Sequence, residues 1–270
     1  MSKIKPFLRW AGGKQWLATK LAGLTPRPKY TYYEPFLGGG SLFFTALPEK
    51  AVLGDINKEI VETYKTLRDS PSELIKILSQ WKNNKKTYYE LRTMESKDPL
   101  WKAARFIFLN KTCWNGLYRV NRQGKFNVPF GNHHRKVFSE THLLEVSVAL
   151  RKAKIRHSDF QLLVETAASG DFVYLDPPYT VLHSKNGFRQ YNESLFSWDD
   201  QIRLAQTARD LADRGCLVVI SNADNKDVLD LYPSFYYQII TRHSILAANP
   251  KWRKKTGEAL IVSSPHLLIS

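Results

Sequence analysis

Short apolar runs alternate along this chain with segments of helical spacing, and this alternation limits the fold more than any other feature. The clearest run is Phe172–Leu175, which is apolar throughout and is stopped by Asp176-Pro177-Pro178-Tyr179. Further strands are predicted at 30–36, 50–54, 216–220 and 259–263. Strands that alternate with helices indicate an α/β fold with a doubly wound, mostly parallel sheet, whose ligand site lies at the carboxyl ends of the strands.

Between the strands, helical spacing is predicted at 57–68, 71–110 and 198–212. The segment 111–137 is different, because it is rich in Asn, Gly, Arg and aromatic residues and has turn signals at Asn115-Gly116 and Gln123-Gly124. We expect a loop or hairpin there.

Charge divides the chain into parts of different character. Its 40 Lys and Arg residues outnumber its 25 Asp and Glu residues, which gives a formal net charge of +15. Residues 61–154 hold 19 basic and 8 acidic residues, whereas residues 155–270 hold 12 and 13. Such an excess predicts a polyanionic partner. We therefore expect a body formed by 1–60 and 155–270, interrupted at 61–154 by a mainly helical recognition domain that contains the hairpin.

The rest of the composition excludes other classes of protein. A hydrophobic share of 43% and a charged share of 24% are typical of a globular chain. No apolar run reaches the length of about 18 residues that a membrane span needs. Cys113 and Cys216 are too few and too far apart for a disulfide framework or a zinc site. The basic start of the chain lacks the apolar core of a secretory signal, so we expect a cytoplasmic protein.

Two elements predict a site for an anionic or polar ligand. The run Phe36-Leu37-Gly38-Gly39-Gly40 joins a strand to a helix, where glycines let backbone N–H groups approach a ligand. A similar turn is found in enzymes that bind NAD or phosphate. Asp55 ends the next strand, where a ribose-binding acid belongs in a doubly wound sheet. The alternative is that Asp55 caps the helix that starts near Asn57.

The strongest signal is Asp176-Pro177-Pro178-Tyr179 at the end of the buried strand. It places a carboxylate, backbone carbonyls without competing N–H groups and a flat aromatic ring in one small volume. An amino group on a planar base fits this set. Asp176 and the Pro177 carbonyl supply two acceptors, which localise the nitrogen lone pair for attack. The alternative is a core strand that merely ends in prolines.

Several segments, taken in order, resemble the Dam-type DNA adenine N6-methyltransferases. They are FLRWAGGK at 7–14, EPFLGGGSLFF at 34–44, GD at 54–55, NGLYRVN at 115–121, FNVPFG at 126–131 and DPPY at 176–179. The match spans almost the whole chain. It implies a Rossmann-like methyltransferase fold, S-adenosylmethionine as the methyl donor, S-adenosylhomocysteine as its product, and no metal.

The resemblance also implies which residues act in the reaction. The W-A-G-G-K element contacts the donor, the glycine turn holds its amino-acid end, the next acid binds its ribose, and an Asp-Phe pair holds its adenine. These donor-binding positions are Trp10, Lys14, Phe36, Gly38, Gly40, Asp55, Asp159, Phe160 and Asp176. The catalytic positions are Asp176, Pro177 and Tyr179, and Tyr179 stacks on an adenine that has left the duplex.

For DNA recognition, the resemblance implies the hairpin at 114–131. Arg119 reads a guanine edge, and Leu117 and Pro129 contact a thymine methyl group, which are pairings favoured in the major groove. Trp114, beside Asn115, holds the position of a wedge that fills the gap left by base flipping.

Arg9 stands where close relatives usually have Lys, and either can donate to a guanine. Other basic residues are predicted to contact phosphates, which gives affinity without sequence information. They are Arg122, Lys125, His133, His134, Arg135 and Lys136, with a second cluster of Lys251, Arg253, Lys254 and Lys255. The segment 180–197, with Phe188, Tyr191 and Asn192, is a candidate lid or a simple surface loop.

We therefore expect an enzyme that methylates adenine N6 in duplex DNA within GATC. We expect it to act as a monomer, or as a dimer on DNA, in association with the nucleoid of a bacterium or on behalf of a phage. Three alternatives stay open. They are a cytosine-N4 DNA methyltransferase, which usually has Ser in place of Asp176, an RNA or protein amide methyltransferase, which typically has Asn there, and a catalytically silent DNA-binding protein. Replication marking with mismatch repair, protection from a restriction nuclease and a phage function all fit the sequence.

Overall fold

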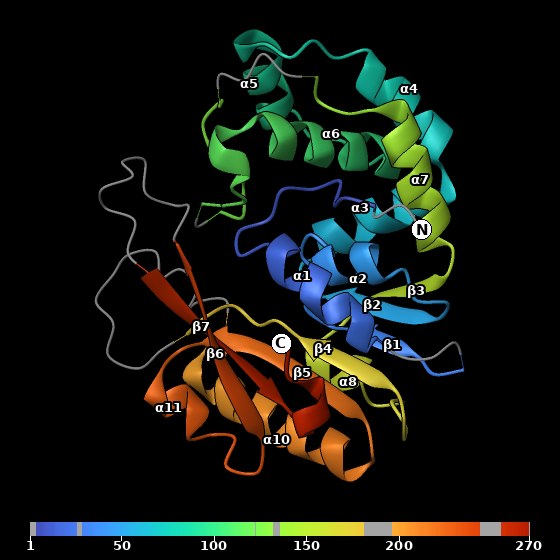
Figure 1. Ribbon diagram of the computed structural model, residues 1–270. Helices are drawn as coiled ribbons and strands as arrows, with labels where there is room; N and C mark the ends of the chain where they lie inside the picture. The colour runs from blue at the N-terminus through green and yellow to red at the C-terminus, as the bar shows by residue number, and fades with distance from the viewer. Residues whose placement is uncertain are drawn as a thin grey trace. The chain divides into compact units, whose positions relative to one another are not determined.

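The computed structural model describes residues 4–25, 29–121, 123–131, 136–180, 196–243 and 255–269. The chain forms two compact units: Met1–Gly23 with Leu37–Ser158, and Leu24–Phe36 with Asp159–Ser270. Both units pair parallel strands and pack helices beside them (Figure 1), which confirms the predicted α/β class. The functional division at residues 60 and 154 remains a prediction.

The first unit pairs two parallel strands and contains most of the helices. Strand β2 (Ala51–Asp55) runs beside β3 (Ala153–His157), with Asp55 opposite His157. Its helices are α1 (Gln15–Leu21), α2 (Ser41–Ala46), α3 (Lys58–Asp69), α4 (Pro71–Ser79), α5 (Lys85–Thr93), α6 (Pro99–Thr112) and α7 (Glu140–Leu150). A single 3-10 turn, η2 (Trp114–Gly116), follows α6.

The helices α3, α4, α6 and α7 pack against one another, and α5 packs on α6 (Figure 1). The helical stretch predicted at 71–110 is thus three separate helices. New helices begin where capping residues occur. The Asn84 side chain accepts a hydrogen bond from Thr87 N, and the side chain of Asp98, which is followed by Pro99, accepts one from Leu100 N. The buried side of α6 is mostly apolar, as at Ile107 and Phe108, and also includes the amide of Asn110.

The second unit is built on five strands in the described residues. Strands β1 (Tyr32–Glu34), β4 (Phe172–Leu175) and β5 (Leu217–Ala223) are parallel, whereas β7 (Lys255–Val262) runs antiparallel to both β5 and β6 (Tyr236–His243). The helices are α8 (Phe160–Leu163), α10 (Trp198–Asp213) and α11 (Lys226–Leu229), with two 3-10 turns, η1 (Ala22–Leu24) and η4 (Pro265–Leu267), elsewhere in the chain. Helix α10 packs on β5.

Two strands were not predicted from the sequence. In β3, basic residues alternate with apolar ones, and only Ala153 and Ile155 are buried, so the run has little apolar character. In β6, Tyr236 and Tyr237 are half exposed, and among the described residues this strand pairs with β7 alone. The strand predicted at 259–263 is the end of the longer β7. None of the helices in the described part of the chain is both long and apolar enough to cross a membrane.

Candidate functional site

In the first unit, the glycine turn before α2 is tied to the end of β2. The Gly38 N–H donates to Oδ2 of Asp55 at 3.0 Å, and the Leu37 N–H donates to the Gly54 carbonyl at 2.9 Å. The hydroxyl of Tyr64 donates to the Gly38 carbonyl at 3.1 Å. Gly38 has φ +45°, so the turn uses the left-handed region that favours glycine. The predicted ribose acid and the predicted glycine turn therefore form one structure.

Trp10 lies against the same turn. A Cβ placed on Gly38 would lie only 2.6 Å from Cδ1 of Trp10, and one on Gly40 would lie 3.1 Å from the Tyr64 hydroxyl. Close approach and conformation thus both favour glycine at position 38, whereas at position 40 the positive φ of 65° is the stronger reason. The structure brings together Trp10, Gly38, Gly40 and Asp55, four positions that the sequence placed at the donor.

Asp55 is not the cap of the following helix. Asn57 fills that role, because its side chain accepts from Glu59 N at 3.0 Å and from Ile60 N at 3.3 Å. Asp55 instead accepts from Gly38 N and Asn57 N, one bond on each oxygen. Burial raises the pKa of the Asp55 carboxyl to about 6, while the two backbone bonds and His157 act in the opposite direction.

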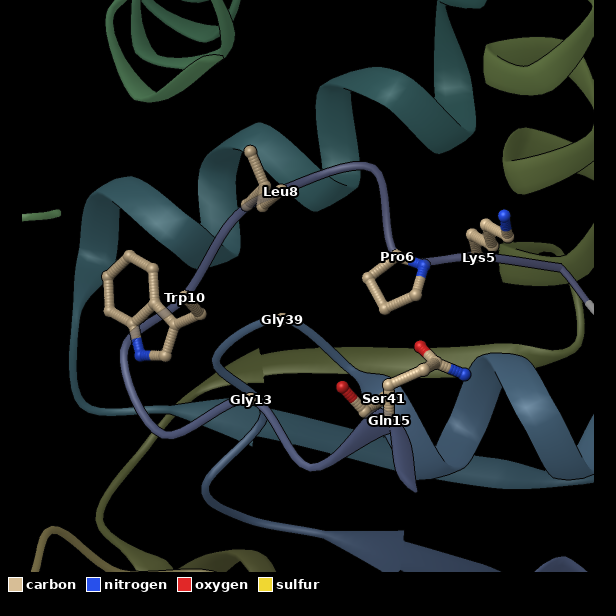
Figure 2. A pocket seen from close by; sticks show the side chains of 8 residues that line it. All are labelled: Lys5, Pro6, Leu8, Trp10, Gly13, Gln15, Gly39 and Ser41. Carbon is tan, nitrogen blue, oxygen red and sulfur yellow. The ribbon is translucent and has the colours of Figure 1, made fainter. Parts of the chain in front are cut away.

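Beside the turn there is a hollow with a volume of about 270 Å³ (Figure 2). Lys5, Pro6, Leu8 and Trp10 of the N-terminal segment line one side of it. The other lining residues are Gly13, Gln15, Gly39 and Ser41. Lys14 is only 4% exposed and does not line this hollow, and neither does Asp55. The hollow therefore adjoins the predicted donor residues without containing all of them.

In the second unit, three phenylalanines pack together. The ring of Phe36 stacks on that of Phe160, with 5.5 Å between centroids, and Phe196 contacts both at 5.6 and 5.9 Å. The predicted donor residues Phe36 and Phe160 are thus adjacent, although they are far apart in sequence. The guanidinium of Arg203 lies 4.9 Å from the Phe160 ring centre and donates to Asp159 at 2.9 Å.

Asp176, Pro177 and Tyr179 follow directly on β4, as predicted. Asp176 and Tyr179 are partly exposed, and Pro177 is buried. Burial raises the pKa of the Tyr179 phenol, and the negative charges of Asp176 and Glu258 raise it further. Behind the strand end, Tyr174 and Ser221 are joined by a hydroxyl hydrogen bond of 3.1 Å, and the Asn222 amide donates to Gln201 at 3.0 Å.

The predicted hairpin is present in the first unit as a loop closed by two isolated bridges, Cys113 with Phe130 and Val120 with Phe126. The Trp114 N–H donates to the Pro129 carbonyl at 2.9 Å, which joins two predicted recognition residues. Both predicted turns are confirmed: Asn115 has φ +53° and Gly116 +64°, and Gly124 has φ +73°.

The side chains expected to read bases are held in different ways. Arg119 is exposed, and its Nε donates to Oδ1 of Asn127 at 2.9 Å. Trp114 is 54% exposed, and Leu117 is partly exposed. The backbone of Arg9 is pinned by Asn110, which accepts from the Arg9 N–H at 2.8 Å and donates to its carbonyl at 2.7 Å.

Gly116 packs against the side chain of Arg9. A Cβ at Gly116 would lie 2.5 Å from Cβ and Cδ of Arg9. Arg9, which is expected at the DNA, is therefore in direct contact with the turn of the recognition hairpin, more than a hundred positions away in sequence.

Sequence reasoning missed four residues that support these positions: Asn110, Tyr118, Phe196 and Arg203. Asn110 gave a signal, because a buried amide in an apolar helix needs hydrogen-bond partners, and Tyr118 stands inside the quoted NGLYRVN segment. Tyr118 stacks on Trp10, and Arg203 and Phe196 pack on Phe160. Their partners come from distant parts of the chain, which periodicity does not reveal.

Most of the predicted phosphate contacts lie outside the described residues. These are Arg122, His133, His134, Arg135, Lys251, Arg253 and Lys254. The candidate lid residues Phe188, Tyr191 and Asn192 also lie outside the described residues. Lys125 and Lys136 are described and exposed. Lys255 is the first residue of β7.

A family model for the D12 class N6 adenine-specific DNA methyltransferases matches residues 10–246. The chain belongs to this family. The resemblance seen in the sequence is confirmed, and the chain is an adenine-specific DNA methyltransferase. Family membership implies S-adenosylmethionine as donor and DNA as substrate. It also decides against the cytosine-N4 alternative and the RNA or protein alternative.

Several relatives are similar over nearly their whole length. Type II methyltransferase M1.LlaDCHI of Lactococcus lactis subsp. cremoris is 34% identical over 96% of this chain and 95% of its own. Type II methyltransferase M.MjaIII of Methanocaldococcus jannaschii is 36% identical over 97% and 99%. The DNA adenine methylase of Escherichia coli K12 is 30% identical over 99% and 98%.

Among solved structures, a precorrin-6y C5,15-methyltransferase from Geobacter metallireducens covers 92% of this chain and 85% of its own, at 8% identity and a TM-score of 0.37. A likeness this distant carries no argument about the reaction.

Proposed function

We propose that this D12-class enzyme methylates N6 of an adenine flipped out of duplex DNA, and that its target sequence is GATC. The observation that carries the proposal is the hairpin at 114–131, where an exposed Trp114 and an exposed Arg119 stand on one closed loop. A large aromatic side chain that is 54% exposed is poorly explained by packing. It suits a wedge between base steps, and Arg119 suits a guanine edge.

Arg9 and Arg119 are the two arginines that we assign to guanines, one for each strand of the palindromic GATC site. Leu117 and Pro129 supply apolar contacts to a thymine methyl group. Asn115 shapes the turn that precedes Leu117 through its positive φ of 53°. Together these residues provide hydrogen-bond donors for the acceptors of G, and apolar surfaces for the methyl group of T, in the major groove.

We assign the donor to the positions that the resemblance implied. Trp10 and Lys14 would contact it, and the glycine turn with Phe36, Gly38 and Gly40 would hold its amino-acid end. The Asp55 carboxylate would bind its ribose, and Asp159 and Phe160 would hold its adenine. The residues fit the group: each Asp55 oxygen has one backbone bond and capacity for another from a hydroxyl. The stacked rings of Phe36 and Phe160 offer an apolar wall for a planar base.

When bound, S-adenosylmethionine supplies a methyl group activated by a positively charged sulfur. The chain's own contribution is to prepare the nitrogen that receives it. The Asp176 carboxylate and the Pro177 carbonyl would accept hydrogen bonds from the two N–H groups of the adenine amine. These two hydrogen bonds localise the lone pair on the amine nitrogen. Tyr179 stacks on the base. N6 would form its bond to the methyl carbon as the carbon–sulfur bond of the donor breaks, which leaves S-adenosylhomocysteine, and the surplus proton on N6 would pass to solvent.

The segment 61–154, which carries the excess of basic residues, would then form the target-recognition domain. Residues 1–60 and 155–270 would form the catalytic domain. Lys125 and Lys136, both exposed, would contact phosphates. The same role is proposed for the basic residues outside the described ranges.

The test uses the purified protein, S-adenosylmethionine with a labelled methyl group, and unmethylated genomic DNA digested to nucleosides after reaction. We expect label in N6-methyladenosine alone. Two synthetic duplexes that differ only in one base of GATC then test the target, and only the intact site should be labelled. Label at adenines outside GATC would overturn the assigned sequence but not the reaction.

A further inference from the structure

Tyr118 connects the recognition hairpin to the donor-binding turn. Its ring stacks on the indole of Trp10 with 5.3 Å between centroids and 29° between planes. Its hydroxyl donates a short hydrogen bond of 2.6 Å to Oε2 of Glu59. Phe106 and Phe126 contact the ring at 5.5 and 5.9 Å. Tyr118 is therefore fixed from several directions while it stays partly exposed.

Trp10 and Glu59, two partners of Tyr118, are both connected to the hydrogen-bonded pair Gly38 and Asp55. Trp10 lies so close to Gly38 that no side chain fits there. Glu59 is in the first turn of α3, two residues after Asn57, which caps the helix and whose N–H donates to Asp55. Asp55 in turn accepts from Gly38. The contacts form a closed ring from Tyr118 through Trp10, Gly38, Asp55, Asn57 and Glu59.

Tyr118 also lies between two residues that we assign to bases. Leu117 precedes it and Arg119 follows it. Any shift of the Tyr118 backbone therefore moves Arg119, whose carbonyl accepts from Asn127 N at 3.1 Å across the hairpin. The side chain of Tyr118 is thus held by the residues around the donor-binding turn, and its backbone is continuous with the two residues that we assign to bases, Leu117 and Arg119.

We propose that Tyr118 is a positioning residue that couples binding of the donor to recognition of DNA. This rests on the proposed function of both sites. A ligand that fixes Trp10 and Asp55 also fixes Tyr118, and the hairpin then loses less conformational freedom when DNA binds. Such coupling is reciprocal, so DNA must strengthen donor binding by the same factor.

The experiment measures four dissociation constants on the full chain. The affinity for an unmethylated GATC duplex is measured with and without S-adenosylhomocysteine, and the affinity for S-adenosylhomocysteine is measured with and without the duplex. For the wild type we expect each ligand to strengthen the other by roughly 5-fold or more, within the usual range of coupling between sites. In Tyr118→Leu, which removes both contacts, we expect the factor to fall close to one.

Two further variants separate the two contacts. Tyr118→Phe keeps the stacking on Trp10 and loses the hydrogen bond to Glu59, so an intermediate factor is expected. Tyr237→Phe is the matched control, because it removes a hydroxyl from an exposed tyrosine in β6, and it should keep the wild-type factor. Thermal unfolding of each variant shows that the fold is kept, and Tyr118→Phe alone suffices if Tyr118→Leu does not fold.

Equal coupling in the wild type and in Tyr118→Phe and Tyr118→Leu would overturn this inference, as would a wild type without coupling. Neither result touches the proposed reaction, which is tested by formation of N6-methyladenosine. A wild type that forms no N6-methyladenosine and does not bind S-adenosylhomocysteine would instead overturn the proposed function, and this inference with it.

Discussion

The N–H of Gly38 donates a hydrogen bond of 3.0 Å to Oδ2 of Asp55, which joins the glycine turn to the acid that ends β2. This bond stabilises the carboxylate, yet burial outweighs it and raises the pKa of Asp55 to about 6. The acid that we assign to the donor ribose is therefore close to its titration range at the pH of the cell. Its protonation has consequences for stability and for binding.

The first prediction concerns stability. In the unfolded chain the pKa of an aspartate is about 3.9. Because the folded-state pKa is higher, the stabilisation from the bound proton is complete below about pH 4 and is lost as the pH rises through about 6. The free energy of unfolding of the wild type should fall relative to that of Asp55→Asn by about 1–2 kcal/mol between these values, an estimate reduced because the side chain is partly exposed.

Denaturant unfolding at several pH values measures this difference. Asp69→Asn is the matched control, because the hydrogen bond from Arg68 lowers the pKa of Asp69. For Asp69 the sign is opposite, and the wild type should gain stability relative to that variant as the pH rises through the acid range. Identical pH profiles for the wild type and Asp55→Asn would contradict the raised pKa.

The second prediction concerns catalysis by Asp176. Asp176→Ala removes one of two acceptors for the adenine amine, so methyl transfer should fall by roughly 10²–10³-fold or more. DNA binding should persist, because the recognition residues are untouched. Single-turnover methylation and duplex binding are measured on the same preparation. Asp171→Asn, which alters a carboxylate just before the opposite end of β4, serves as the control for loss of charge.

The third prediction concerns the contact between Gly116 and Arg9. Gly116→Ala meets both a positive φ of 64° and the Arg9 side chain at 2.5 Å. Gly124→Ala has a similar φ of +73° but nothing within 4 Å of its Cβ. Both variants should lose about 1 kcal/mol or more through backbone strain. Only Gly116→Ala should also weaken discrimination at the guanine assigned to Arg9, measured by binding to duplexes changed at that base.

The sequence predicted local features well. The strand predicted at Phe172–Leu175 has the same bounds as β4, because a short apolar run that is followed by two prolines is typical of a buried strand that ends there. The turns at Asn115-Gly116 and at Gly124 follow from residues that tolerate positive φ. Asp55 beside the glycine turn was also expected, since strand ends of this fold converge.

Contacts between distant segments were beyond such reasoning. Tyr118 stands inside a quoted motif, but nothing in its spacing shows that it stacks on Trp10. The ion pair of Arg203 with Asp159 joins α10 to the start of α8 across 44 positions. These side chains have no periodic pattern, and only the folded chain brings them together. The roles of Trp10 and Phe160 came from the resemblance, because aromatic residues at these positions are equally compatible with ordinary packing.

The last prediction concerns Arg119, whose Nε is held by Asn127 at 2.9 Å while its terminal nitrogens remain to donate. Arg119→Ala should weaken discrimination at one guanine by about 1–3 kcal/mol and leave donor affinity unchanged. Asn127→Ala should have a smaller effect at the same base, because the guanidinium stays but is no longer oriented. Lys125→Ala, an exposed lysine on the same hairpin, should weaken binding to all duplexes equally. Competition binding with duplexes changed at each position gives these numbers. A uniform loss in Arg119→Ala would make it a phosphate contact, and the target would then have to be read by other residues.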